Sequence, residues 1–137
     1  DLNSIRATIE GRLATELANS PAIPVVFHNM AYEPTPNSSW VQCLTTFGAS
    51  EYLGHGLATS SRNRIVGLVV MNIFSSKGVG PGANLVIGKR IRDLYNSVIV
   101  SGVFFDAPFG PEVSATPTPE GYFQTQVRVT FEFIEEL

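Results

Sequence analysis

The sequence predicts an α+β protein in which two main helices pack on one mixed, mostly antiparallel sheet. Three segments carry this prediction: an amphipathic stretch over residues 3–18, a second one beginning near Pro81 or Ala83, and an alternating strand over Phe123–Phe133. In the alternating strand the odd positions are Phe, Thr, Val, Val, Phe and Phe, and the even positions are Gln, Gln, Arg, Thr and Glu. Such alternation is typical of an antiparallel strand with one buried and one polar face, and the polar face is expected to meet solvent or line a lumen.

The composition bounds the fold to a single domain, residues 1–137. Hydrophobic residues make up 44% and charged residues 15% of the chain, whereas charged residues are about 25% of an average domain. The hydrophobic share excludes a disordered chain, and the low charge favours a subunit that buries surface against partners. No apolar run approaches the roughly 18 residues of a membrane span, so no membrane partner is expected.

The first predicted helix, residues 3–18, is expected to bury one stripe of side chains against a sheet. Apolar residues recur every four positions along it, at Ile5, Ile9, Leu13 and Leu17. Two strands are predicted next, over Ile23–His28 and Trp40–Phe47.

The glycine-bearing segment Gly48–Ser61 is expected to lie between strands. It also carries Tyr52, Leu53 and Leu57, apolar groups that a solvated loop does not need. Two interpretations stay open: an arm that docks on another subunit, or a poorly packed loop.

A long strand, 64–74, is apolar at nearly every position, which predicts that both of its faces are covered. A strand over 98–105 should continue the core, and a turn-rich stretch should precede the alternating strand. The helix between them is expected to direct a set of side chains inward: Leu85 or Ile87, then Ile91, Leu94 and Tyr95.

Charge is segregated along the chain. No Asp or Glu occurs from Tyr52 to Arg92, whereas seven acids and one base, Arg128, follow from Asp93 onward. Solvated surface charge is the plainer interpretation, and a bipolar subunit whose two surfaces meet neighbouring copies is the functional one. Nucleic-acid binding as the main activity is disfavoured, because few aromatics accompany the basic residues.

One glycine pattern, Gly78-x-Gly80-x-x-Ala83 with Asp106 downstream, resembles a dinucleotide fingerprint. The acid lies beyond the expected interval of about 20 residues, and Pro81 lacks an N–H for a phosphate. Gly82–Arg90 is not a P-loop, since its glycines are spaced too widely and no Ser or Thr follows the lysine.

Side chains with catalytic or metal-binding potential are scattered. His28 and His55 lack a second ligand at metal-binding spacing, and Cys43 in an apolar strand is typical of an inert core thiol. We therefore predict no enzyme activity, no catalytic residue, no cofactor and no metal. A small nucleotide-binding enzyme that uses the Gly78–Gly82 turn is the less favoured alternative.

The order of segments resembles the tail terminator, or tail completion, proteins of long-tailed bacteriophages. The resemblance rests on segments spread over nearly the whole chain: IRATIEGRLATEL, PVVFHNMAYEP, RIVGLVVMNIF, SSKGVGPGA and FQTQVRVTFEF. It implies a structural subunit that forms a hexameric ring, caps the tail tube and joins the head. A related phage neck or head–tail connector protein is the alternative.

That resemblance also implies the partners and the location. The partners would be further copies of the chain, the tail tube protein and a neck or connector protein, with DNA passing through the lumen. The ring would be assembled in the host cytoplasm and reside in the virion at the head-proximal end of the tail. We expect the interface to use residues of the central segment: Tyr52, Leu53, Leu57, Arg62, Arg64 and Lys77.

Overall fold

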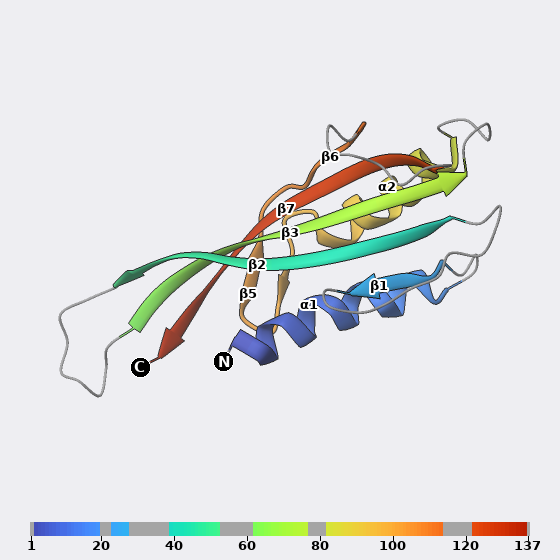
Figure 1. Cartoon of the computed structure of the whole chain (residues 1–137). Coiled ribbons are helices and arrows are strands. Elements are labelled where there is room, and N and C mark those ends of the chain that lie inside the picture. Colours follow the sequence, from blue (N-terminus) through green and yellow to red (C-terminus); the bar gives the residue numbers. More distant parts are fainter. Residues whose placement is uncertain are drawn as a thin grey trace.

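The computed structural model describes residues 2–19, 23–27, 39–52, 62–76, 82–113 and 122–136, and for 49–52, 62, 76, 122, 135 and 136 it describes the backbone alone. Helices α1 (Leu2–Leu17) and α2 (Gly82–Tyr95) form one layer against a single sheet, which confirms the predicted α+β class (Figure 1). The strands are β1 Val25–Phe27, β2 Trp40–Tyr52, β3 Arg62–Ser76, β4 Ile99–Val100, β5 Val103–Phe105, β6 Phe109–Val113 and β7 Tyr122–Glu136. Neither described helix is long and apolar enough to cross a membrane.

The seven-stranded sheet has the order β1-β2-β3-β7-β5-β4, and β6 also pairs with β7. Only the β1–β2 pair is parallel among the described strands. β3 pairs with β7 along its whole length, from Arg62 opposite Glu136 to Ser76 opposite Tyr122. β5 and β6 must therefore share the other edge of β7, one after the other.

Three strands differ from the sequence-based expectation. The predicted strand 98–105 is a hairpin of β4 and β5, because Ser101 and Gly102 take positive φ values of 49° and 82°, as a two-residue hairpin turn requires. The predicted turn-rich stretch contains β6, which tolerates Pro111 because it lies at a sheet edge. β2 runs five residues beyond Phe47, across a bulge between Phe47 and Ser50, so the predicted loop Gly48–Ser61 begins inside a strand.

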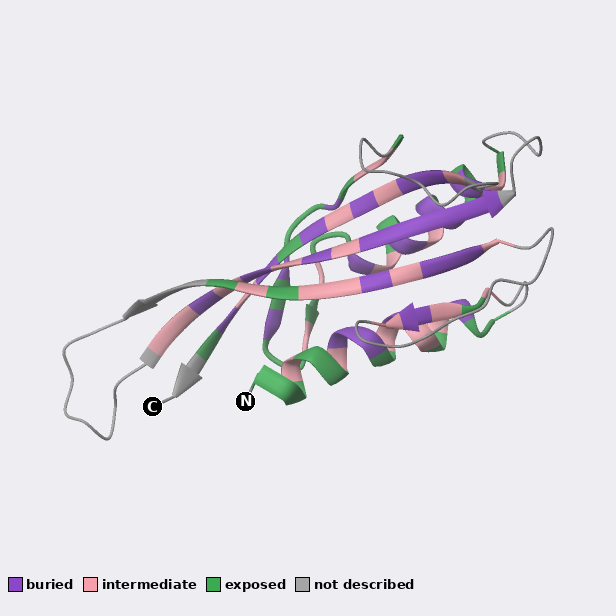
Figure 2. Cartoon of the chain, in the orientation of Figure 1, coloured by how far each residue is buried: buried purple, intermediate pink, exposed green. Residues whose placement is uncertain are grey.

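The core lies between the helices and the odd-numbered positions of the long strands. On α1 the buried side chains are Ile9, Leu13 and Leu17, with Ile5 partly buried, as predicted. On α2 they are Ile87, Ile91 and Tyr95, whereas Leu85 is 51% exposed, so Ile87 is the inward residue of the predicted pair. The alternation predicted for β7 is confirmed by the buried set Val127, Val129, Phe131 and Phe133 (Figure 2).

Three polar side chains tie the two helices together in an antiparallel pair. The Tyr95 hydroxyl donates to the Ile9 carbonyl at 2.7 Å. Arg12 of α1 donates to the Leu94 carbonyl near the end of α2, and Arg90 of α2 donates to the Glu16 carbonyl near the end of α1. Each helix thus supplies a cation to the negative C-terminal end of the other, where carbonyls lack partners within the helix.

Two titratable groups are held neutral in this core. Burial, and secondarily the charge of Glu10, raises the pKa of the Cys43 thiol to about 12. Burial likewise raises the pKa of Tyr95 above its ordinary value. Cys43 is therefore an inert thiol at neutral pH, as predicted from its apolar strand.

Substituting Gly67 should destabilise the protein. A Cβ there would lie 2.3 Å from Phe131 Cζ and 2.7 Å from the Thr46 carbonyl oxygen. We expect Gly67→Ala to lower the free energy of unfolding by about 1–3 kcal/mol in urea titrations. The matched control is Gly11→Ala, where a Cβ would meet nothing within 4 Å. That helical substitution should raise stability by about 0.5–1 kcal/mol, and equal effects at both sites would contradict the packing described.

The buried thiol also predicts a pH dependence. Because its pKa is raised on folding to about 12, the unfolded chain loses the Cys43 proton first, from about pH 8.5 upward. The free energy of unfolding should therefore fall as pH rises from about 8.5 to 10, by up to about 1.4 kcal/mol per pH unit for this group. Cys43→Ala should flatten the slope while lowering stability at pH 7. Identical slopes would rule out this origin.

Candidate functional site

The candidate site is the face of the sheet opposite the helices, which we call the open face. The odd positions of β3 and β7 point into the core, so their even positions point away from it. Phe104 pairs with Glu132 and Phe109 pairs with Arg128, which places both phenylalanines on the same side. The open face comprises Leu44, Thr46, Arg64, Val66, Leu68, Val70, Phe104, Phe109, Arg128, Thr130, Glu132 and Ile134.

Much of the open face is apolar and reachable by a partner. Phe104, Phe109 and Ile134 are 43%, 58% and 51% exposed. Half-buried aliphatic side chains lie on the neighbouring strands β2 and β3: Leu44, Val66, Leu68 and Val70. The prediction that both faces of β3 are covered holds only for its last described side chains, 71–75, which are all buried. Arg128, Thr130 and Glu132 of β7 lie between these aliphatic side chains and the two phenylalanines, so the open face carries two apolar areas with a polar column between them. Exposed apolar area of this kind is typical of a protein interaction site.

The charges on this face are paired within the chain. Arg64 forms an ion pair with Glu132 across β3 and β7. Arg128 pairs with Glu112 at 2.8 Å, and its guanidinium lies 4.8 Å from the centre of the Phe109 ring. The open face therefore presents little net charge, and contact with it is governed by shape and apolar area.

A ladder of amide side chains bounds the open face at one end. Asn72 donates to the Gln42 side-chain oxygen at 3.1 Å, and Gln126 donates to the Asn72 side-chain oxygen at 2.9 Å. Beyond the ladder, Trp40 stacks on Phe74 with ring centroids 4.2 Å apart. These cross-strand contacts couple β2, β3 and β7 on the side that lacks helices.

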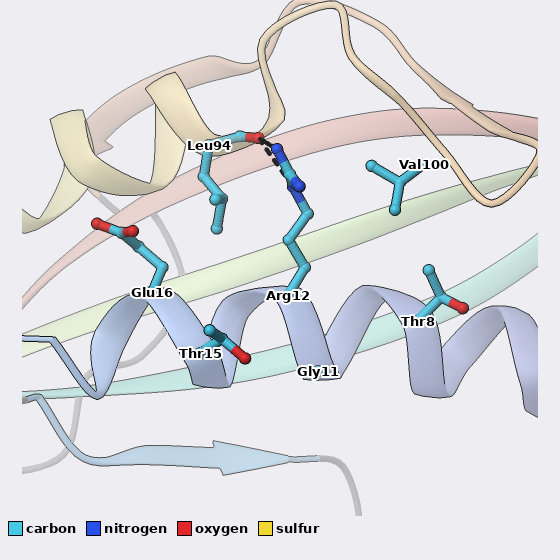
Figure 3. Close-up of a pocket in the computed structure, with 7 residues that line it drawn as sticks. All are labelled: Thr8, Gly11, Arg12, Thr15, Glu16, Leu94 and Val100. Atoms are coloured by element: carbon cyan, nitrogen blue, oxygen red, sulfur yellow. Dashed lines mark hydrogen bonds between the residues drawn. The ribbon is translucent and has the colours of Figure 1, made fainter.

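Away from the open face, a concavity of about 350 Å³ lies between the helices and β4 (Figure 3). Its lining residues are Thr8, Gly11, Arg12, Thr15, Glu16, Leu94 and Val100. Arg12 is its most basic group, but two of its N–H groups point to the Leu94 carbonyl, at 3.1 and 2.8 Å. The guanidinium thus caps a helix, and its role in this concavity is structural.

The structure describes only part of the interface set predicted from the sequence, and that set stays a prediction. Tyr52 ends β2 and Arg62 starts β3, so these two positions lie at the same end of the sheet, near Arg64. Ser76, the last residue of β3, lies roughly 45 Å from Arg62 at the rise of a strand. Lys77 lies outside the described residues. Leu53 and Leu57 are also outside the described residues.

Sequence reasoning missed the apolar members of the open face on β5 and β6. Phe104 and Phe109 lie in the two short strands that were not recognised as separate pairing partners of β7. One signal in the sequence could have found them. The even positions of β7 are polar and predicted to be exposed, so any residue that pairs with an even position of β7 must also face outward. Their side chains complete a surface that β3 and β7 begin.

The nucleotide-binding alternative conflicts with the topology. A dinucleotide site needs a helix that joins two parallel strands of one sheet. Here α2 leads from β3 into the antiparallel β4–β5 hairpin, and Asp106 accepts a hydrogen bond from the Thr130 hydroxyl at 2.6 Å. Gly78, Gly80, His28 and His55 lie outside the described residues, and the described ones contain no group of three metal-ligating side chains.

The sequence and the fold were compared with those of known proteins. No curated protein matches the chain. Several solved structures match the fold, and one of them has a TM-score of 0.68 and 17% identity, with 97% of this chain and 95% of that chain covered. The family model described as phage tail terminator protein matches residues 4–131. Because this match covers nearly the whole sequence, the chain belongs to the phage tail terminator family and is a structural protein of the phage tail.

Proposed function

We propose that this protein assembles head to tail into a hexameric ring that closes the tail tube at its head-proximal end. One rim of the ring contacts the tail tube protein, and the other offers a surface to a neck or connector protein of the head. DNA passes through the lumen without being processed. Membership of the tail terminator family supports the location, and the open face supports the self-association.

The proposal of self-association rests on the open face, where exposed apolar side chains lie beside charged side chains that form ion pairs within the same subunit. Each copy has a formal net charge of −3, so copies repel one another weakly as they approach, and a contact of low net charge that buries apolar area can offset this repulsion. On the open face the ion pairs Arg64–Glu132 and Arg128–Glu112 are satisfied within one subunit. Exposed Phe104, Phe109 and Ile134 then offer apolar area to a neighbouring copy.

Ion pairs within the chain leave fewer basic residues for contacts with neighbouring subunits than the charge segregation in the sequence suggests. Several cations of the basic segment pair with acids of the same chain: Arg64 with Glu132, Lys89 with Asp93, and Arg90 with Glu16. Arg62 and Lys77 stay proposed contacts to acids of a neighbouring subunit or the tail tube. Tyr52, Leu53 and Leu57, at and beyond the end of β2, stay the proposed apolar anchors.

Mass in solution tests the ring directly. We expect multi-angle light scattering to show a species near six subunits that grows with protein concentration or on addition of tail tubes. The physical reason is that a head-to-tail contact must close after a fixed rotation. A protein that stays monomeric under both conditions would refute the proposed assembly.

A pair of variants tests which surface joins the subunits. Phe109→Glu places a charge on the open face, at a side chain 58% exposed. We expect it to abolish assembly while changing the free energy of unfolding by less than about 0.5 kcal/mol, since surface substitutions rarely do more. The matched control is Leu85→Glu, at a side chain 51% exposed on α2, which should still assemble. The opposite result would move the interface to the helix layer.

A further inference from the structure

A concavity of about 220 Å³ lies on the open face, across β3, β7 and the start of β6. Its lining residues are Leu68, Ala107, Phe109, Arg128 and Thr130. All five belong to the part of the chain that the structure describes, and Phe109 is 58% exposed, so a partner can reach the concavity from outside. We call it the open-face pocket.

The polar side chains of the open-face pocket have partners within the same chain. Arg128 pairs with Glu112, and its guanidinium lies against the phenyl ring of Phe109. The Thr130 hydroxyl donates to an Asp106 carboxylate oxygen at 2.6 Å. A charged occupant would compete with these pairs, whereas an apolar side chain can fill the space beside them and leave them intact. The pocket therefore fits an apolar side chain.

The open-face pocket is also large enough for one such side chain. An apolar cavity of about 150 Å³ can hold a benzene molecule, and this concavity exceeds that volume. Leu68, Ala107 and Phe109 supply its apolar walls. Filling it would remove apolar area from water on both partners, which is the main favourable contribution to association.

A head-to-tail ring requires that a different surface of each copy enters the pocket of the next copy. The exposed apolar pair Leu85 and Val86 is followed by three cations within residues 89–92, so it would bring charge to the contact. The segment 53–61 contains two leucines and no Asp, Glu, Lys or Arg. An uncharged segment of this kind matches a pocket whose charges are paired. It lies outside the described residues.

We propose that Leu57 of one copy enters the open-face pocket of the neighbouring copy. Leu57 is the middle residue of the segment that joins Tyr52 of β2 to Arg62 of β3, so it can extend about 17 Å from the end of the sheet. The inference rests on the proposed ring and names both sides of its subunit contact. One side is the face of the sheet and the other is its end, as a heterologous contact requires.

Leu57 is less well placed for the pocket of its own copy. Tyr52 stands opposite Asn63, and Leu68 of the pocket lies five residues further along β3, which is about 17 Å at the rise of a strand. Leu57 would span that distance only if the segment turned back over the open face and ran fully extended. A neighbouring copy has no such restriction.

Photocrosslinking between isotopically distinct copies tests the contact. Benzoylphenylalanine, a photoreactive residue, is placed at position 57 of the unlabelled full chain, which is then assembled with ¹⁵N-labelled wild-type protein and irradiated. We expect crosslinks from position 57 to residues 104–109 or 128–130 of the labelled copy. The matched control carries the same photoreactive residue at position 85, where the native side chain is 51% exposed on α2, and should give no crosslink to those residues.

A double-mutant cycle gives a second readout with natural side chains. Leu57→Ser should raise the protein concentration needed for half-assembly at least about tenfold, because a buried leucine side chain is lost. Ala107→Leu fills the open-face pocket and should have a similar effect. Combined with Leu57→Ser, Ala107→Leu should add little, since the pocket is then already empty of its occupant. Ala58→Ser is the control in the same segment and should assemble as the wild type does.

The outcomes separate this inference from the ring itself. A ring whose crosslinks from position 57 fall outside the pocket, or within one copy, overturns the inference and leaves the ring standing. A ring in which Leu57→Ser has no effect, or in which the effects of the two substitutions simply add, overturns it as well. A protein that is monomeric at every concentration, with and without tail tubes, overturns both proposals.

Discussion

The register of β3 against β7 is the constraint on which the rest of the structure depends. It fixes which side chains of the two longest paired strands enter the core and which form the open face, and a shift by one residue would exchange the two sets. Gly67 stands directly opposite Phe131, whose ring fills the space that a side chain at Gly67 would occupy. The phenylalanine ring therefore packs over the glycine that faces it, and this pairing helps to fix the register because a larger residue would not fit opposite Phe131.

The helix layer depends on that register and reinforces it. Odd-numbered side chains of both strands provide the surface on which Ile9, Leu13 and Ile91 are fully buried. The reciprocal contacts of Arg12 and Arg90 then hold the helices to each other. One carbonyl near the C-terminal end of each helix, Leu94 or Glu16, is thereby satisfied by the partner helix.

Local periodicity predicted much of this fold from the sequence. Both helices, their buried stripes and the alternation of β7 follow from patterns of a few residues within one segment. Ile87, not Leu85, is the buried residue because the sheet decides which side of α2 is covered. The β4–β5 hairpin and β6 were missed because pairing with β7, a contact distant in sequence, makes them strands.

The site was less predictable than the fold. The predicted interface residues come from the glycine-bearing segment Gly48–Ser61 and from basic residues that follow it, whereas the open face draws on β2, β3, β5, β6 and β7 together. Phe104 and Phe109 meet Glu132 and Arg128 through register alone, and no motif in the sequence signals it. Arg62, Arg64 and Lys77 share a positive charge, which a sequence shows, but their positions in space depend on β3, whose two ends are far apart.

The common direction of β2 and β7 gives the proposed ring a polarity. Subunits related by rotation all point the same way, so the two rims cannot be alike. One rim would carry the ends of β2 and β7 and the start of β3, at Tyr52, Glu136 and Arg62; the other would carry the opposite ends, at Trp40, Tyr122 and Ser76. The proposed ring, with the tail tube on one side and a neck or connector protein on the other, would need such an asymmetry. Here the order and direction of three strands would supply it, without a second kind of subunit.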